Sequence, residues 1–173
     1  KEPDVIPQDS SSENEEDNLR VTPQNVKQDT PENPESGKSN AKKTQSSQPE
    51  YVVKVDISDQ KVYVYRNGTQ IRTMICSTGV KGHETPEGTF KIKGRGEWFF
   101  SKKFQQGGKY WVGFIGGTYL FHSVPTDHKQ RIIEEEALKL GMPASHGCVR
   151  LSEDDARWFF NTIPDGSKVD IQK

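Results

Sequence analysis

The stretch "QKVYVYRNGTQIRTMICS", residues 60–77, decides the fold class. Val62 and Val64 alternate with polar or amphipathic neighbours, which is the period of two that a half-buried strand needs. The Asn67-Gly68 pair favours a two-residue hairpin turn, because both central positions of that turn need a positive φ. The rest of the stretch returns as the partner strand. The stretch therefore predicts an antiparallel β-hairpin.

Further strand signals surround this hairpin. Short runs rich in Val, Ile, Tyr and Phe recur along the chain, as is typical of strands. Pro86 and Gly88 fit the second and fourth positions of a turn before one of these runs. The runs cover residues 51–57, 89–92, 110–115, 118–124 and 168–172. The sequence therefore predicts a mostly β domain.

Two short helices are predicted to interrupt the strands. The first covers 127–140, between Asp127 as a candidate N-cap and Gly141 as a candidate C-terminal stop. In the second, Ser152 can cap the start, three acidic residues favour the positive end of the helix dipole, and Pro164 ends it. The apolar residues that define the face of the second helix are Ala156, Phe159, Phe160 and Ile163.

The chain changes character near residue 50. Residues 1–50 hold none of the 16 aromatic residues and 6 of the 10 prolines, and they carry a net charge of −5. Such a segment buries too little apolar area to offset the cost of ordering its backbone. We therefore predict a disordered linker or tether over 1–49 and one folded domain over 50–173. The whole chain has a net charge of −1, so we expect no nucleic-acid partner.

The leader offers two readings of location. The sequence lacks a run of about 18 apolar residues, which a membrane-spanning helix needs. It does not begin with Met, and Lys1 opens no secretory signal. The polar leader suits a tether between the folded domain and an N-terminal anchor outside this chain. The alternative is an ordinary disordered tail on a cytosolic protein.

Candidate chemistry concentrates in "PASHGCVRLSEDD", residues 143–155. A thiol with a pKa of about 8.5 is mostly protonated at neutral pH, so an active Cys148 needs a base or a cation nearby. His146 lies on the same side of an extended segment but is too close along the chain for good geometry. His122, in a predicted apolar strand, is the better base. The N–H groups of Gly147 and Cys148 are candidate oxyanion donors.

Other roles for these residues stay open. A cysteine is often a small buried apolar residue, and we predict this for Cys76 in its apolar strand. His122 can equally be a core histidine that bonds a backbone carbonyl. Zinc binding by His122, His146 and Cys148 is a weaker alternative, because no fourth ligand stands at a usual spacing. We expect neither a metal nor a cofactor.

The segment 95–117 is aromatic, basic and glycine-rich. By its position it is either a lid over the site, with Trp98, Tyr110 or Trp111 as wall residues, or an ordinary surface hairpin.

Three motifs together resemble a known family. "SHGCVRL" (145–151), "LFHSV" (120–124) and "TPEGTF" (85–90) are similar to those of the L,D-transpeptidase catalytic domain (YkuD-type) of bacterial cell walls. The resemblance covers about 51–172 and implies a β-sandwich-like fold. It also implies a cysteine acyltransferase that attacks the tetrapeptide stem of peptidoglycan before its terminal D-Ala. The thioester passes to an amine of another stem and makes a 3→3 cross-link.

The resemblance implies roles for individual residues. Cys148 corresponds to the nucleophile, His122 to the general base, and Ser123 to the residue whose backbone carbonyl holds the base in its tautomer. Gly147 is part of the same catalytic set. Arg150 corresponds to a residue that can meet a substrate carboxylate. The candidate substrate-binding residues are Ser145, His146, Arg150, Tyr110 and Trp111.

The resemblance also implies partners and a location, and the chain departs from the family in one spacing. It implies that the chain binds peptidoglycan stem peptides and β-lactams of the carbapenem class. It also implies a location outside the cytoplasm, at the cell wall or cell surface. We expect a monomer. The alternatives are an L,D-carboxypeptidase, with water as acceptor, and an inactive peptidoglycan-binding module. The 22 residues between His122 and Ser145 exceed the family's usual spacing, and the predicted helix over 127–140 can absorb them.

Deleting residues 1–48 is expected to leave the melting temperature and the activity on soluble substrate nearly unchanged. A segment without aromatic residues should make few packed contacts. Calorimetry on the shortened and the full chain measures this, and a drop of several degrees would show that the segment belongs to the fold.

Overall fold

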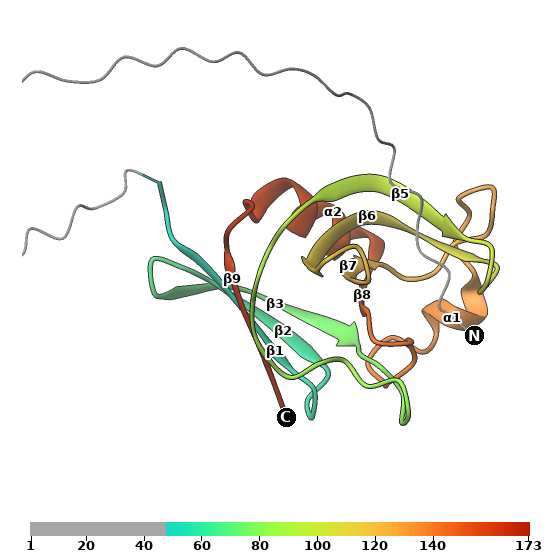
Figure 1. Cartoon of the computed structure of the whole chain (residues 1–173), viewed down its shortest axis with the longest axis horizontal. Helices are drawn as coiled ribbons and strands as arrows, with labels where there is room; N and C mark the ends of the chain where they lie inside the picture. The colour runs from blue at the N-terminus through green and yellow to red at the C-terminus, as the bar shows by residue number, and fades with distance from the viewer. Residues whose placement is uncertain (1–47) are drawn as a thin grey trace, which may run out of the picture. The chain divides into compact units, whose positions relative to one another are not determined.

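In the computed structural model, which describes residues 48–173, nine strands form one strongly curled sheet (Figure 1). The order of the strands across the sheet is β4-β9-β1-β2-β3-β8-β7-β6-β5. The predicted linker over 1–49 lies, except for its last two residues, outside the described part of the chain. The strands are β1 (Tyr51–Asp56), β2 (Lys61–Arg66), β3 (Thr69–Ser77), β4 (Gly88–Lys91), β5 (Arg95–Ser101), β6 (Gln106–Ile115), β7 (Tyr119–Ser123), β8 (Val149–Leu151) and β9 (Lys168–Gln172).

The hairpin predicted over 60–77 is present as β2 and β3. Asn67 and Gly68 at its turn have φ values of 50° and 81°, as a two-residue turn with two positive φ angles requires. Val62 and Val64 point into the core and are fully buried. The pairing of β2 with β3 shifts register between Val64 and Tyr65, so a bulge bends this hairpin.

β3 joins the two halves of the curled sheet. Most of the strand pairs with β2, whereas Cys76 and Ser77 at its end pair with β8. The apolar faces of the two halves share one core, to which Val53 and Val55 contribute from one half and Phe121 from the other. The prediction of a mostly β, sandwich-like fold with two short helices is therefore confirmed, and Figure 1 shows how the sheet curls.

The second predicted helix is α2 (Glu153–Thr162), and it has the predicted cap. Ser152 Oγ accepts a hydrogen bond from the Asp155 N–H, and Pro164 follows the C-terminal end. Phe159 is fully buried and stacks on Phe121 of β7, with ring centroids 4.5 Å apart. α2 therefore packs directly on the strand that carries His122.

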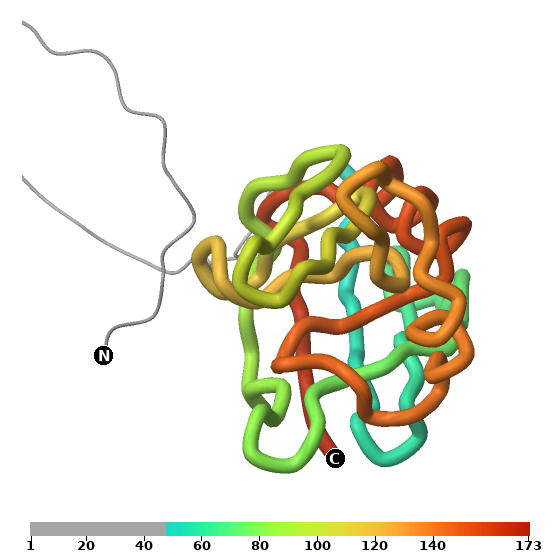
Figure 2. The backbone as a smooth tube through the Cα atoms, turned by 90° about the vertical axis from the view of Figure 1, so that its right-hand side faces the viewer, coloured from blue at the N-terminus to red at the C-terminus, as the bar shows by residue number. Residues whose placement is uncertain are grey.

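The prediction of a helix over 127–140 is wrong over most of that length. α1 covers only Glu134–Ala137. The Asp127 carboxylate accepts the N–H groups of Lys129 and Arg131 and so closes a local turn. This alternative for the backbone competes with helix formation, which explains why the helix does not start at Asp127. Figure 2 shows the connection from β7 to β8, in orange, as a run of loops along one side of the domain.

Neither helix within residues 48–173 is long and apolar enough to cross a membrane.

Candidate active site

The parallel pair of β7 and β8 places the candidate catalytic residues. His122 pairs with Arg150, and Phe121 pairs with Val149. Continued by one residue, this register sets Leu120 beside Cys148. Paired positions point to the same side of a sheet, as do alternate residues of a strand, so Cys148, His122 and Arg150 share one face. Such diagonal neighbours lie roughly 7–8 Å apart between backbones, within reach of an imidazole ring.

The contacts of the His122 ring fix its tautomer and its charge. Its Nδ1 lies 2.7 Å from the Ser123 carbonyl oxygen, and because a carbonyl can only accept, Nδ1 carries the proton and Nε2 keeps a lone pair. Burial, reinforced by the nearby Arg150 guanidinium, lowers the pKa of His122 to about 4 against the opposing effect of the Ser123 bond. The ring is therefore neutral at pH 7. The carbonyl contact that the family resemblance implied for Ser123 is present.

Residues of β5 and β6 pack against the His122 ring. Phe99 of β5 meets it edge to face, with ring centroids 5.2 Å apart. A Cβ atom on Gly108 of β6 would lie 2.5 Å from His122 Nδ1, so the ring fits only because this residue is glycine. The Lys109 N–H also donates to Ser123 Oγ at 2.9 Å. The sequence analysis missed Phe99 and Gly108, although the Gly107-Gly108 pair inside a strand is a signal of close approach.

The Cys148 thiol is half-buried and protonated at rest. Its Sγ lies 3.8 Å from the Thr118 carbonyl oxygen. Burial raises the pKa of the thiol, while the Leu120 N–H and the charge on Arg150 act in the opposite direction. Such a thiol needs a base to become a nucleophile. Cys76 is fully buried and burial raises its pKa to about 12, so its thiol is inert.

The Ser145 hydroxyl forms two hydrogen bonds within the loop that leads to Cys148. It donates to the Cys148 carbonyl oxygen at 2.6 Å and accepts the Gly147 N–H at 3.0 Å. The second bond takes the Gly147 N–H out of the predicted oxyanion hole, so that part of the prediction is wrong, and the Cys148 N–H remains as the candidate donor. Because Ser145 is buried, its hydroxyl serves the loop and does not face a substrate.

Gly147 and Thr85 explain why this loop needs its motif residues. Gly147 has a φ of +117°, and a Cβ there would lie 2.5 Å from the Tyr119 ring. Thr85, the first residue of "TPEGTF", donates its hydroxyl to the Gly147 carbonyl at 2.9 Å and accepts the Gly79 N–H at 2.9 Å. The "TPEG" turn and the "SHGC" loop are therefore parts of one buried structure, a contact between distant segments that the sequence analysis did not foresee.

The tip of the β5–β6 hairpin lies against the "SHGC" loop. Phe104 stacks on His146, with ring centroids 4.4 Å apart, and His83 contacts the same ring in an edge-type arrangement, with centroids 4.9 Å apart. Of the two alternatives for residues 95–117, this contact favours the lid. The aromatic residues involved are not those predicted for the wall.

The three predicted wall residues lie elsewhere. Tyr110 packs on Phe160 of α2, with ring centroids 6.0 Å apart. Trp111 covers Gly96 of β5, where a Cβ would lie 2.4 Å from its Nε1. Trp98 donates its Nε1–H to the Thr126 hydroxyl at 3.2 Å. The structure does not bring Tyr110 or Trp111 together with Cys148 and His122.

Arg150 is buried in an ion pair that the sequence analysis missed. Its Nη1 lies 2.7 Å from Glu136 Oε2 of α1, and its Nη2 lies 3.3 Å from Gln106 Oε1. The guanidinium therefore already has an anionic partner. Pairing between residues on separate elements leaves no local pattern, so no signal in the sequence could have identified Glu136.

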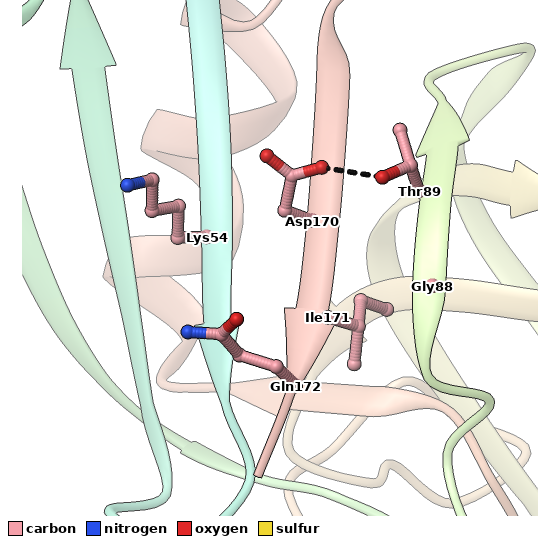
Figure 3. A pocket seen from close by; sticks show the side chains of 6 residues that line it. All are labelled: Lys54, Gly88, Thr89, Asp170, Ile171 and Gln172. Carbon is pink, nitrogen blue, oxygen red and sulfur yellow. Dashed lines mark hydrogen bonds between the residues drawn. The ribbon is translucent and has the colours of Figure 1, made fainter.

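Two other kinds of site remain, a metal site and a separate pocket, and the described residues bear on both. Within residues 48–173, no three His, Cys, Asp or Glu side chains converge as metal ligands. An open, polar hollow of about 270 Å³ lies at β1, β4 and β9 (Figure 3). It contains neither a thiol nor an imidazole, and its carboxylate, Asp170, is bonded to Thr89. The residues that line the hollow are Lys54, Gly88, Thr89, Asp170, Ile171 and Gln172.

Comparisons with known proteins point to one family. The L,D-transpeptidase catalytic domain (YkuD) matches residues 50–171. YciB of Bacillus subtilis (strain 168), a curated candidate L,D-transpeptidase, is 45% identical over 124 residues, which are 69% of this chain and 64% of YciB. The chain therefore spans less than two thirds of this relative.

Solved structures show the same fold. L,D-transpeptidase 3 from Mycobacterium tuberculosis, in complex with a faropenem-derived adduct, has a TM-score of 0.59 at 22% identity and covers 72% of this chain and 61% of its own. LdtMt1 in complex with imipenem has a TM-score of 0.62 at 23% identity, over 72% and 59% of the two chains. At these identities the two structures support the fold alone. The family match over residues 50–171 covers more than half of the chain, so the chain belongs to the L,D-transpeptidase catalytic domain (YkuD) family of cell-wall enzymes.

Proposed function

We propose that this chain is a peptidoglycan L,D-transpeptidase with Cys148 as its nucleophile. His122 Nε2 takes the thiol proton, and Sγ attacks the carbonyl carbon of the third residue of a tetrapeptide stem. An S–C bond forms, the C–N bond to the terminal D-Ala breaks, and the D-Ala amine leaves with the proton from His122. An amine of another stem then attacks the thioester and gives up a proton as the C–S bond breaks, which restores the thiol and makes a 3→3 cross-link.

One observation carries this proposal. The register of β7 and β8, continued by one residue beyond Val149, puts Cys148 diagonally across from His122, whose Nδ1 donates to the Ser123 carbonyl so that Nε2 is the free acceptor. A neutral imidazole beside a protonated thiol is the arrangement of a general base and its nucleophile. Two β-lactams occupy relatives of the same fold, and the strained lactam carbonyl can take the place of the scissile amide. We therefore infer that carbapenems acylate this chain too.

The proposed substrate also sets the proposed location. Peptidoglycan lies outside the cytoplasmic membrane, so the catalytic domain acts there, and residues 1–49 serve as its tether. We propose a monomer, because the proposed chemistry uses residues of one chain. Size-exclusion chromatography with light scattering measures this directly.

The function is tested with purified disaccharide-tetrapeptide and mass spectrometry of the products. Cross-linked dimers that have lost one terminal D-Ala are expected. Tripeptides without dimers would assign an L,D-carboxypeptidase, and unchanged substrate with a folded protein would favour an inactive peptidoglycan-binding module.

Replacing Gly108 by alanine is expected to slow carbapenem acylation by about tenfold or more, because the added methyl group displaces the base ring from its place. Stopped-flow fluorescence or time-resolved intact mass gives the rate. Gly117→Ala is the matched control, since a Cβ there meets nothing within 4 Å, and it should acylate at the wild-type rate. A wild-type rate in folded Gly108→Ala would show that the close approach of β6 does not position the base.

The pH profile of acylation follows from the pKa of His122, which burial lowers to about 4. The neutral, base-competent form persists above that pH, so activity present at pH 7.5 is lost only as the pH falls toward 4. Rates at pH 5.5 and 7.5 are expected to agree within about twofold. An imidazole with an ordinary pKa near 6.5 would instead lose about tenfold over this range, and that result would contradict a buried neutral base.

A further inference from the structure

One carboxylate of the connection between His122 and Ser145, that of Glu136, forms an ion pair with Arg150. Glu136 on α1 places Oε2 2.7 Å from Arg150 Nη1, and both side chains are largely buried, with exposed fractions of 14% and 7%. The other oxygen of Glu136, Oε1, receives Lys139 Nζ at 2.6 Å. Arg150 Nε finds no partner among residues 48–173. The main anionic partner of the Arg150 guanidinium is therefore the Glu136 carboxylate.

Arg150 stands where a substrate anion would otherwise be attracted. It shares a face of the sheet with His122 and Cys148, and its charge acts on the pKa values of both groups. An unpaired guanidinium in a partly buried site binds carboxylates strongly, because two N–H groups match two oxygens. Glu136 already supplies such an oxygen. A free carboxylate of the substrate would have to displace it from a buried pair, which is costly.

Other charges near the loop do not replace this pair. Lys139 faces Glu136 from the solvent side, with about half of its side chain exposed. Lys103 and His83 act on His146, which lies on the exposed side of the "SHGC" loop. Glu134 and Glu135, the neighbours of Glu136 on α1, are exposed. Glu136 is thus the acidic residue of α1 that reaches the guanidinium.

We propose that Glu136 is a specificity-determining residue that occupies the carboxylate-binding position of Arg150, so that the site takes stem peptides with a neutral group, such as an amidated carboxyl, next to Cys148. This inference rests on the proposed function and assigns its substrate class. It replaces the role of substrate-carboxylate receptor that the family resemblance implied for Arg150.

Two reagents that differ only in charge test the inference at the thiol itself. Iodoacetamide and iodoacetate each form an S–C bond with Cys148, release iodide and leave the thiol proton to solvent. Peptide mapping assigns the alkylation to Cys148, and Cys76 stays unmodified because it is fully buried. The measured quantity is the ratio of the iodoacetate rate to the iodoacetamide rate for each variant at one pH.

In Glu136→Gln this ratio is expected to rise about fivefold or more, because Arg150 becomes available to the anionic reagent. Glu135→Gln removes the same charge from an exposed position of α1 and should keep the wild-type ratio. Glu136→Asp keeps the charge and should stay close to wild type. An unchanged ratio in folded Glu136→Gln would overturn the proposal.

A second measurement needs no variant. The wild-type chain is given two disaccharide-tetrapeptides that differ only in whether the free carboxyl of the third residue is amidated. Turnover of the amidated stem is expected to be at least about tenfold faster, and equal rates or a preference for the free acid would overturn the proposal. Turnover of neither stem would count against the proposed function, whereas the alkylation ratio would still report on Glu136.

Discussion

Replacing Cys148 by alanine is expected to abolish product formation from disaccharide-tetrapeptide, a loss on the order of 10³-fold or more, as when a covalent nucleophile is removed. Cys148 directly precedes β8, and the register of β8 with β7, continued by one residue, puts it on the same face of the sheet as His122. Under the proposed mechanism, the Cys148 sulfur is the atom that forms the thioester. Mass spectrometry of the products measures the loss, and circular dichroism shows whether the variant is folded.

Cys76→Ala is the control for this result. Cys76 is fully buried on β3, and burial raises its pKa to about 12, so it contributes packing and no chemistry. We expect this variant to keep most of the activity and to lose some stability. Equal loss of activity in the two folded variants would mean that the chemistry has been assigned to the wrong thiol.

His122→Ala is expected to slow acylation by roughly 10²–10⁴-fold, as is typical when a positioned proton-transfer group is lost. The Cys148 thiol, whose pKa is raised by burial, is left without the group that takes its proton. The rate of adduct formation with a carbapenem measures the effect. His128→Ala is the matched control, because this histidine is exposed and contacts Phe100 rather than the site, and its rate should equal that of the wild type.

A folded His122→Ala protein that acylates at the wild-type rate would move the base role away from β7. His146 would then be the next candidate, since it lies two residues before Cys148 and stacks on the hairpin tip. Partial desolvation of its ring and the charges of His83 and Arg150 also lower its pKa.

Sequence patterns predicted those parts of the fold that local chemistry decides. Alternating Val62 and Val64 marked a strand, and Asn67-Gly68 marked its turn, because period and positive φ are properties of adjacent residues. Ser152 and the acidic residues after it marked the start of α2 for the same reason. The Asp127 cap was misread, because its carboxylate can close either a helix or a turn, and only the surrounding packing decides which.

The site was predictable only in part, for a physical reason. The motif around Cys148 stands out within one segment, but the contacts that position it join segments far apart in sequence. Thr85 holds the Gly147 carbonyl across 62 residues, and Glu136 meets Arg150 from a separate helix. Gly108 matters because a ring from another strand fills the space of its missing side chain. Such complementarity exists only once the sheet has curled.

Peptide mapping of the carbapenem adduct identifies the residue that acts as the nucleophile. The full chain is incubated with a carbapenem, its intact mass is recorded, and the modified peptide is sequenced. We expect one added drug molecule, located on the peptide that contains Cys148, and no adduct in Cys148→Ala. An adduct on any other residue, or an unmodified mass with a folded protein, would contradict the assignment of Cys148 as the nucleophile of this chain.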